Sequence, residues 1–142
     1  MTISIIYHNP DLIKLEKIQF GDWIDLRAAE NVILHPGEFR LISLGVSMKL
    51  PDGYEAHIVP RSSSFKNWGF LQTNSVGIID NSYSGTNDIW KLSVYATRAA
   101  EIHVNDRICQ FRIFKQMPEL ELLEVQTLDE TNRGGFGTTG IR

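Results

Sequence analysis

Cysteine is almost absent from the sequence, which limits the chemistry open to the chain. Cys109 is the only cysteine among 142 residues, so it cannot form a disulfide within the chain. It stands in an apolar run and is predicted to be a buried, structural side chain. Because a chain without internal disulfides is typical of a reducing compartment, we expect a cytoplasmic protein.

Long apolar runs and an excess of positive charge are also missing. No apolar run approaches the ~20 residues that a membrane helix needs, and the start MTISIIYHNP lacks the basic residues of a signal peptide. The formal net charge is -3 and the lysines and arginines are scattered. We therefore expect neither a membrane nor a nucleic acid as partner. A chain of 142 residues that is 42% hydrophobic fits one globular domain with a substantial core.

What the sequence does contain is alternation of apolar and polar residues. Residues 90–97 alternate in this way, and a period of two predicts a strand with one buried face. Turn signals such as His35-Pro36-Gly37 and Pro51-Asp52-Gly53 separate the apolar runs. The many short strands predict an all-β sandwich or jelly roll. Besides 90–97, strands are predicted over residues 3–7, 39–50, 54–59, 76–79, 108–114 and 120–125.

One stretch, residues 62–69, departs from the strand pattern and predicts a two-turn helix. Three serines can cap its start, Phe65 and Trp68 are three residues apart, and Gly69 can end it in a left-handed conformation. The preceding residues, Pro60-Arg61, leave a predicted strand. Backbone N–H groups, hydroxyls and a guanidinium therefore converge, as in an anion-binding site. The alternative interpretation is that the serines only cap the helix.

Asp80 follows a predicted apolar strand and begins a sharp turn over residues 80–85. Most aspartates in such a place only form the turn. The functional alternative is a general base held beside a phosphate site, with Tyr83 offering a flat face next to it.

The C-terminal segment, residues 132–142, carries four glycines around a single phenylalanine. It could be a frayed tail. It could also be a mobile flap, in which Phe136 stacks on a flat ring while Arg133, Thr138 and Thr139 meet negatively charged oxygens.

Five segments, in order along nearly the whole chain, together resemble the motifs of the trimeric dUTP diphosphatase (dUTPase) family. A looser resemblance links the chain to phage and prophage members from Gram-positive bacteria. The five segments are WIDLRA at 23–28, PRSSS at 60–64, NSVGIIDNSYSG at 74–85, DRICQ at 106–110 and RGGFGTTG at 133–140.

This resemblance implies a homotrimer of distorted β jelly rolls, each with one short helix and a flexible C-terminal arm. Residues 1–130 would form the jelly-roll domain and residues 131–142 the glycine-rich flap. The trimer would hydrolyse dUTP to dUMP and pyrophosphate with Mg2+, and each active site would draw residues from three subunits.

The resemblance also implies the site residues. Asp80 would activate the water that attacks the α-phosphorus, and Asp25 would contact the metal through a coordinated water. The phosphates would be held by Arg61, Ser62, Ser63 and Gln110. Uracil would be read by Asn74 and the main chain of Gly77, Ile78 and Ile79, with Tyr83 against the deoxyribose and Arg133, Phe136, Thr138 and Thr139 closing the flap.

The sequence departs from the family's usual motifs at four places. Asp22 and Trp23 stand where a small pair is usual, and Asn105 stands where a glycine is usual. Thr131 stands where an arginine is common, two residues ahead of Arg133, and residues 86–88 lengthen the hairpin after the third motif.

Two other functions are open to this sequence. A relative of the dCTP deaminases would need a catalytic glutamate near the base pocket, and no glutamate occurs between Tyr83 and Glu101. A nucleotide-gated regulatory protein, as among phage members of the family, would bind dUTP without releasing pyrophosphate, and the longer hairpin is the feature that favours it.

Overall fold

The computed structural model describes residues 1–137, 140 and 141, and within them a chain of short strands with one short helix. The elements in order are β1 (Ser4–Tyr7), β2 (Ile24–Arg27), β3 (Val32–Leu34), β4 (Phe39–Ser43), β5 (Val46–Lys49), β6 (Tyr54–Pro60), α1 (Ser64–Trp68), β7 (Phe70–Gln72), β8 (Gly77–Ile79), β9 (Lys91–Ala96), β10 (Ala100–Ile102) and β11 (Arg107–Lys115).

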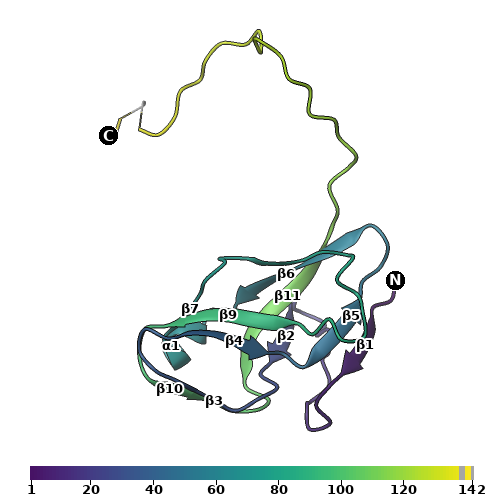
Figure 1. Cartoon of the computed structure of the whole chain (residues 1–142), viewed down its shortest axis with the longest axis vertical. Helices are drawn as coiled ribbons and strands as arrows, with labels where there is room; N and C mark the ends of the chain where they lie inside the picture. Colours follow the sequence, from purple (N-terminus) through teal and green to yellow (C-terminus); the bar gives the residue numbers. More distant parts are fainter. Residues whose placement is uncertain (138–139, 142) are drawn as a thin grey trace.

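Two antiparallel sheets enclose the core (Figure 1). One has the strand order β2-β11-β6-β8 and the other β4-β9-β7, while β1-β5 and β10-β3 form two-stranded ribbons. Leu26 and Ile58 from the first sheet and Leu92 from the second are buried in one hydrophobic cluster. Trp90 packs edge-on against Phe111 across this cluster, with ring centroids 5.2 Å apart. The predicted all-β class with one short helix is confirmed.

The strand and helix predicted with the clearest patterns are both present. Residues 90–97 contain β9, in which Leu92, Val94 and Ala96 are buried in alternation. The helix predicted over 62–69 is α1, and Gly69 ends it with φ 67°, its N–H donating to the carbonyl of Phe65 at 2.7 Å. Within the described residues, α1 is the only helix, and its five residues are far too few to cross a membrane.

The apolar run predicted as one strand over residues 39–50 is two strands, β4 and β5, in different sheets. The chain turns between them at Gly45, which has φ 65°. A Cβ atom there would lie 2.5 Å from Ala29 Cβ, so this close approach requires glycine. The short strands β2, β3, β7 and β10 were not predicted, since three or four residues hardly establish a period.

The strand predicted over residues 120–125 is wrong. The chain after β11 leaves the sheets as an extended arm without regular structure in its described residues (Figure 1). Leu122 is 91% and Leu123 74% exposed, so the apolar residues of this segment are not buried against their own chain. A strand needs a partner edge, and the sheets formed by the described residues supply none here. The division into a domain of residues 1–130 and a flap of residues 131–142 stays a prediction.

Candidate active site

A cationic corner, made by Arg61, Ser62 and Gln110, forms where β6 ends and α1 begins. Arg61 directly follows Pro60, the last residue of β6, and its Nε lies 3.0 Å from Asp25 Oδ1 on β2. Gln110 on β11 donates to the carbonyl of Pro60 at 3.1 Å. These three side chains and Ser62 line one open pocket of about 330 Å³, together with Asp22 and Trp23. The structure therefore brings Asp25, Arg61, Ser62 and Gln110 together, as predicted.

Ser64 holds the turn that carries Arg61. Its hydroxyl accepts from the backbone N–H of Arg61 and donates to the carbonyl of Ile108, both at 3.0 Å, and the side chain is completely buried. Ser63 is the N-cap residue of α1, yet its hydroxyl makes no capping hydrogen bond. The predicted side-chain cap is therefore wrong at Ser63. The hydroxyl that does bond the backbone here is that of Ser64, and it joins the Arg61 turn to β11. Ser63 stays a predicted phosphate contact.

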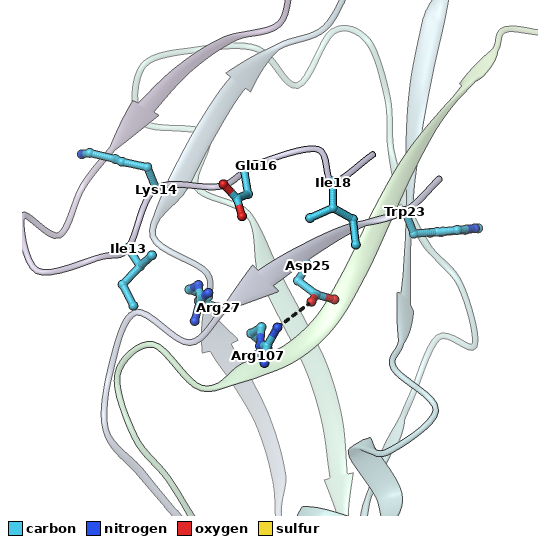
Figure 2. A pocket seen from close by; sticks show the side chains of 8 residues that line it. All are labelled: Ile13, Lys14, Glu16, Ile18, Trp23, Asp25, Arg27 and Arg107. Atoms are coloured by element: carbon cyan, nitrogen blue, oxygen red, sulfur yellow. Dashed lines mark ion pairs between the residues drawn. The ribbon is translucent and has the colours of Figure 1, made fainter. Parts of the chain in front are cut away.

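A second pocket, of about 170 Å³, lies on the other side of Asp25 (Figure 2). Arg27 and Arg107 reach into it from below, and Arg107 Nη1 lies 3.6 Å from Asp25 Oδ2. Arg107 thus forms an ion pair with Asp25. The Asp25 carboxylate separates the two pockets and faces an arginine on each side.

The hairpin around β8 presents Asp80 to solvent. β8 is the edge strand of its sheet and pairs with β6 alone. Asn81 anchors the following turn by donating to the carbonyls of Pro51 and Tyr54 at 2.9 and 2.8 Å. Asp80 Oδ2 accepts from the hydroxyl and the backbone N–H of Ser82. These hydrogen bonds hold the pKa of the Asp80 carboxyl below its ordinary value, and the bond from the Ser82 hydroxyl has the larger effect. The carboxyl is therefore ionised at neutral pH.

The other predicted uracil and sugar contacts lie on the same hairpin. Asn74 is exposed and accepts from the Gln72 side chain at 3.0 Å. Tyr83 is 39% exposed, and its hydroxyl donates to the carbonyl of Ile89 at 3.0 Å, which fixes the ring. Gly77 is buried against Ile58, and Ile78 is 57% exposed.

The hairpin and the cationic corner lie apart in one chain. Ile79 pairs with Ala56, so Asp80 is level with residue 55, six positions before Arg61. At about 3.3 Å per residue, this places Asp80 roughly 20 Å from Arg61 along the direction of β6. A single chain therefore does not bring the predicted base to the predicted phosphate contacts.

The predicted flap residues lie on the arm. Phe136 is fully exposed, and Arg133 lies on the same exposed segment. Thr138 and Thr139 lie outside the described residues.

Metal ligands are sparse in the described part of the chain. Residues 1–137, 140 and 141 contain no group of three or more His, Cys, Asp or Glu side chains that could hold a metal ion. Asp25, which is predicted to contact a metal, lines the pocket of about 330 Å³, and Asp22 beside it pairs with Arg112 at 2.8 Å.

Several side chains of the site were not predicted. Ser64 holds the Arg61 turn and Asn81 anchors the turn after β8. Asp22 and Trp23 line the pocket that contains Arg61. The serine run did signal the turn at Ser64, but nothing local indicates that its partner is the carbonyl of Ile108.

Comparison with known proteins decides the family. The dUTPase family profile matches residues 23–140, which is most of the chain. The chain belongs to the dUTPase family. The SPbeta prophage-derived deoxyuridine 5'-triphosphate nucleotidohydrolase of Bacillus subtilis strain 168 is 54% identical over 142 residues, the full length of both chains. The deoxyuridine 5'-triphosphate nucleotidohydrolase of Helicobacter pylori strain J99 is 33% identical over 144 residues, covering 99% of this chain and 98% of that protein.

Solved dUTPase structures share the fold. A variant of the Staphylococcus bacteriophage 80alpha dUTPase with dUpNHpp superposes with a TM-score of 0.80 at 20% identity, covering 99% of both chains. A dUTPase variant of phage phi11 of S. aureus, which coordinates a structural Mg(II) ion, gives 0.74 at 18% identity, covering 89% of this chain and 99% of that one. The predicted jelly-roll fold and the likeness to phage and prophage dUTPases are confirmed.

The dUTPase fold explains two departures from the family motifs. Asn105, where glycine is usual, has φ 77°, a left-handed conformation that asparagine tolerates better than most residues. Its side chain also accepts from the N–H of Ile13 and donates to the carbonyl of Asp11. In the longer hairpin, the Asp88 side chain accepts from the N–H of Gly85 at 2.8 Å and closes the extra turn.

Proposed function

We propose that this chain hydrolyses dUTP to dUMP and pyrophosphate, which keeps uracil out of DNA and supplies dUMP for dTMP synthesis. The observation that carries the proposal is the dUTPase family match over residues 23–140, which includes all five motifs. The chemistry of the site supports it, because the cationic corner with Arg61 suits phosphate binding and the exposed, ionised carboxylate of Asp80 suits a general base.

Asp80 is the proposed base. It orients the attacking water and takes its proton as the water adds to the α-phosphorus and the pyrophosphate leaves. Its Oδ2 is engaged by Ser82, which leaves Oδ1 to face the water. The lowered pKa keeps the carboxylate in its basic form down to acidic pH, at the cost of a weaker pull on the proton.

Neutralising the triphosphate falls to the cationic corner. Arg61 offers a planar set of N–H donors fixed by Asp25, and Ser62, Ser63 and Gln110 add neutral donors. Arg133, Thr138 and Thr139 of the flap would close over the outer phosphates. Phosphoryl transfer needs mainly such positioning and charge neutralisation.

Uracil recognition falls to the hairpin. Because β8 is an edge strand, the N–H and C=O groups on its outer edge are not used within the sheet. The main chain of Gly77, Ile78 and Ile79 can therefore read the ring edge together with Asn74, and cytosine would leave buried donors and acceptors unpaired. Tyr83, fixed through Ile89, would lie against the deoxyribose, and Phe136 would cover the ring.

Magnesium fits the donor set only as an ion shared with the substrate. Mg2+ commonly binds one or two carboxylates, several waters and substrate phosphates. Asp25 supplies one carboxylate, and both of its oxygens already face arginines, so a contact through water suits it better than a direct bond. When bound, the ion would neutralise phosphate charge and polarise the phosphorus.

The assembly we propose is a homotrimer in which each site combines residues of neighbouring copies. The separation of Asp80 from Arg61 within one chain supports this, as does an arm whose apolar residues are exposed. A mixing experiment tests it. Asp80→Asn and Arg61→Ala chains, unfolded and refolded together, should regain about one quarter of the wild-type sites by random assembly, whereas each variant alone stays inactive. No recovery would contradict a shared site.

The activity is tested by pyrophosphate release from dUTP, dTTP, dCTP and UTP, with and without Mg2+. Only dUTP should be hydrolysed rapidly. Asp80→Asn should bind dUTP but turn it over at least about a hundred times more slowly, because removing a general base typically costs ~10²- to 10⁴-fold. Asp52→Asn, in an exposed turn, is the matched control and should keep full turnover. Near-normal turnover by Asp80→Asn would refute the role of that residue.

A regulatory role that uses the same site is the second candidate. Thr86 and Asn87 extend the hairpin as exposed residues held by the Asp88 turn, so they offer a surface beside the substrate. A protein of this kind that only binds would take up dUTP without releasing pyrophosphate, so the same assay separates the two functions. The cytoplasmic location stays a prediction.

A further inference from the structure

We propose that Arg107 is a positioning residue that fixes the phosphate-binding guanidinium of Arg61 through the shared carboxylate of Asp25. This inference rests on the proposed function of the Arg61 corner. It assigns a task in the proposed catalysis to the ion pair between Arg107 and Asp25.

The first observation is the geometry of the three side chains. Arg61 Nε lies 3.0 Å from Asp25 Oδ1, and Arg107 Nη1 lies 3.6 Å from Asp25 Oδ2. Arg61 Nη1 also donates to the main-chain carbonyl of Arg107 at 3.2 Å. Arg61 is thus held at two of its nitrogens, once by Asp25 and once by the backbone of Arg107.

The second observation is the irregular pairing of β11 with β2. Gln110 pairs with Asp25 and Cys109 with Leu26, but Arg107, not Ile108, stands opposite Arg27. This bulge lets both Ile108 and Cys109 be fully buried in succession. It also turns Arg107 to the face of the sheet that carries Asp25. Bulges commonly re-aim one side chain beside an active site, and here that side chain is Arg107.

The third observation is that Arg107 does not line the pocket of about 330 Å³ that contains Arg61. It lines the smaller pocket of Figure 2 with Arg27, whereas Arg61, Ser62 and Gln110 line the larger one. Asp25 lines both. Arg107 therefore reaches the phosphates only through Asp25 and Arg61, which makes it a positioning residue.

Charge explains why a second arginine is needed. A carboxylate facing Arg61 alone would neutralise the charge that a triphosphate must meet. With Arg107 on its other oxygen, Asp25 shares its negative charge between two cations, and the group of three keeps one net positive charge. The carboxylate then aligns Arg61 while the corner stays attractive to phosphate.

The test is the dissociation constant of the imido analogue dUpNHpp for variants of the full chain. Arg107→Gln should weaken binding about 3- to 10-fold, the usual effect of disturbing one charge-assisted contact. Arg107→Lys keeps a cation near Asp25 Oδ2 and should stay within about 2-fold of the wild type. Arg40→Gln is the matched control, because Arg40 also pairs with two carboxylates, Glu30 and Glu38, on a different sheet. It should not change binding.

A double-mutant cycle separates positioning from a merely structural role. In an Arg61→Gln background, Arg107→Gln should add less than about 2-fold, because the residue it acts through is gone. An equal loss in both backgrounds, or unchanged binding in Arg107→Gln alone, would overturn the proposal. If Arg107→Gln folds poorly, Arg107→Met keeps the aliphatic stem and serves in the same cycle. Absence of dUTP hydrolysis by the wild type would instead overturn the proposed function.

Discussion

Replacing Ser64 by alanine should destabilise the protein far more than the loss of one hydroxyl suggests. The Ser64 hydroxyl is fully buried between the turn of Arg61 and strand β11. Alanine fills almost the same space, so packing changes little. What is lost is the hydrogen-bonding partner of two main-chain groups, the N–H of Arg61 and the carbonyl of Ile108.

The magnitude follows from these two groups. A buried polar group left without a partner costs about 1–3 kcal/mol, so the two together should lower the free energy of unfolding by about 2–6 kcal/mol. With a urea m-value of about 2 kcal/mol/M, the unfolding midpoint should fall by roughly 1–3 M. Because the same hydroxyl holds the Arg61 turn, the KM for dUTP should rise in the folded variant.

The assay is urea unfolding followed by tryptophan fluorescence, which reports on the buried Trp90. Protein concentration must be held fixed, since the stability of an oligomer depends on it. Ser63→Ala is the matched control, because Ser63 makes no capping hydrogen bond, and its midpoint should hardly move. A loss below about 0.5 kcal/mol in Ser64→Ala would refute the reasoning, since it would mean that water or a shifted backbone satisfies both groups.

Three further predictions concern the base, the arm and the thiol. Ser82→Ala removes the main cause of the lowered pKa of Asp80, so the acidic limb of the kcat/KM profile should move to higher pH, while the exposed Ser84→Ala should leave it in place. Ending the chain after Asp129 should leave a folded trimer with little activity, because β11, the last strand, ends at Lys115. Circular dichroism, size-exclusion chromatography and pyrophosphate release check this, and aggregation or full activity would contradict it. Burial, and then the charge of Asp25, raise the pKa of the Cys109 thiol, so it should stay unmodified by a thiol reagent at pH 8 until urea unfolds the protein.

The sequence predicted the local parts of the site well. Arg61, Ser62 and Gln110 do line one pocket with Asp25, and Asp80 does directly follow an edge strand. The motifs predicted local conformation because each is a strand end or turn that depends on its own few residues. That Asp25, Arg61 and Gln110 meet was implied only by the family resemblance. The prediction failed over residues 120–125, where apolar residues suggested a strand but pair with no strand in the part of the chain that the structure describes.

By itself the sequence determined the all-β class, the place of the helix and the local conformation at the motifs. Alternation in β9 and the glycine after α1 fix local backbone conformation, and such preferences act over a few residues. The tertiary structure alone decided which of these residues meet. Strand order puts Asp25 between Arg61 and Arg107, and the β6–β8 register holds Asp80 apart from them. Pairing between distant strands depends on long loops closing and on a shared core, which no short stretch of residues encodes.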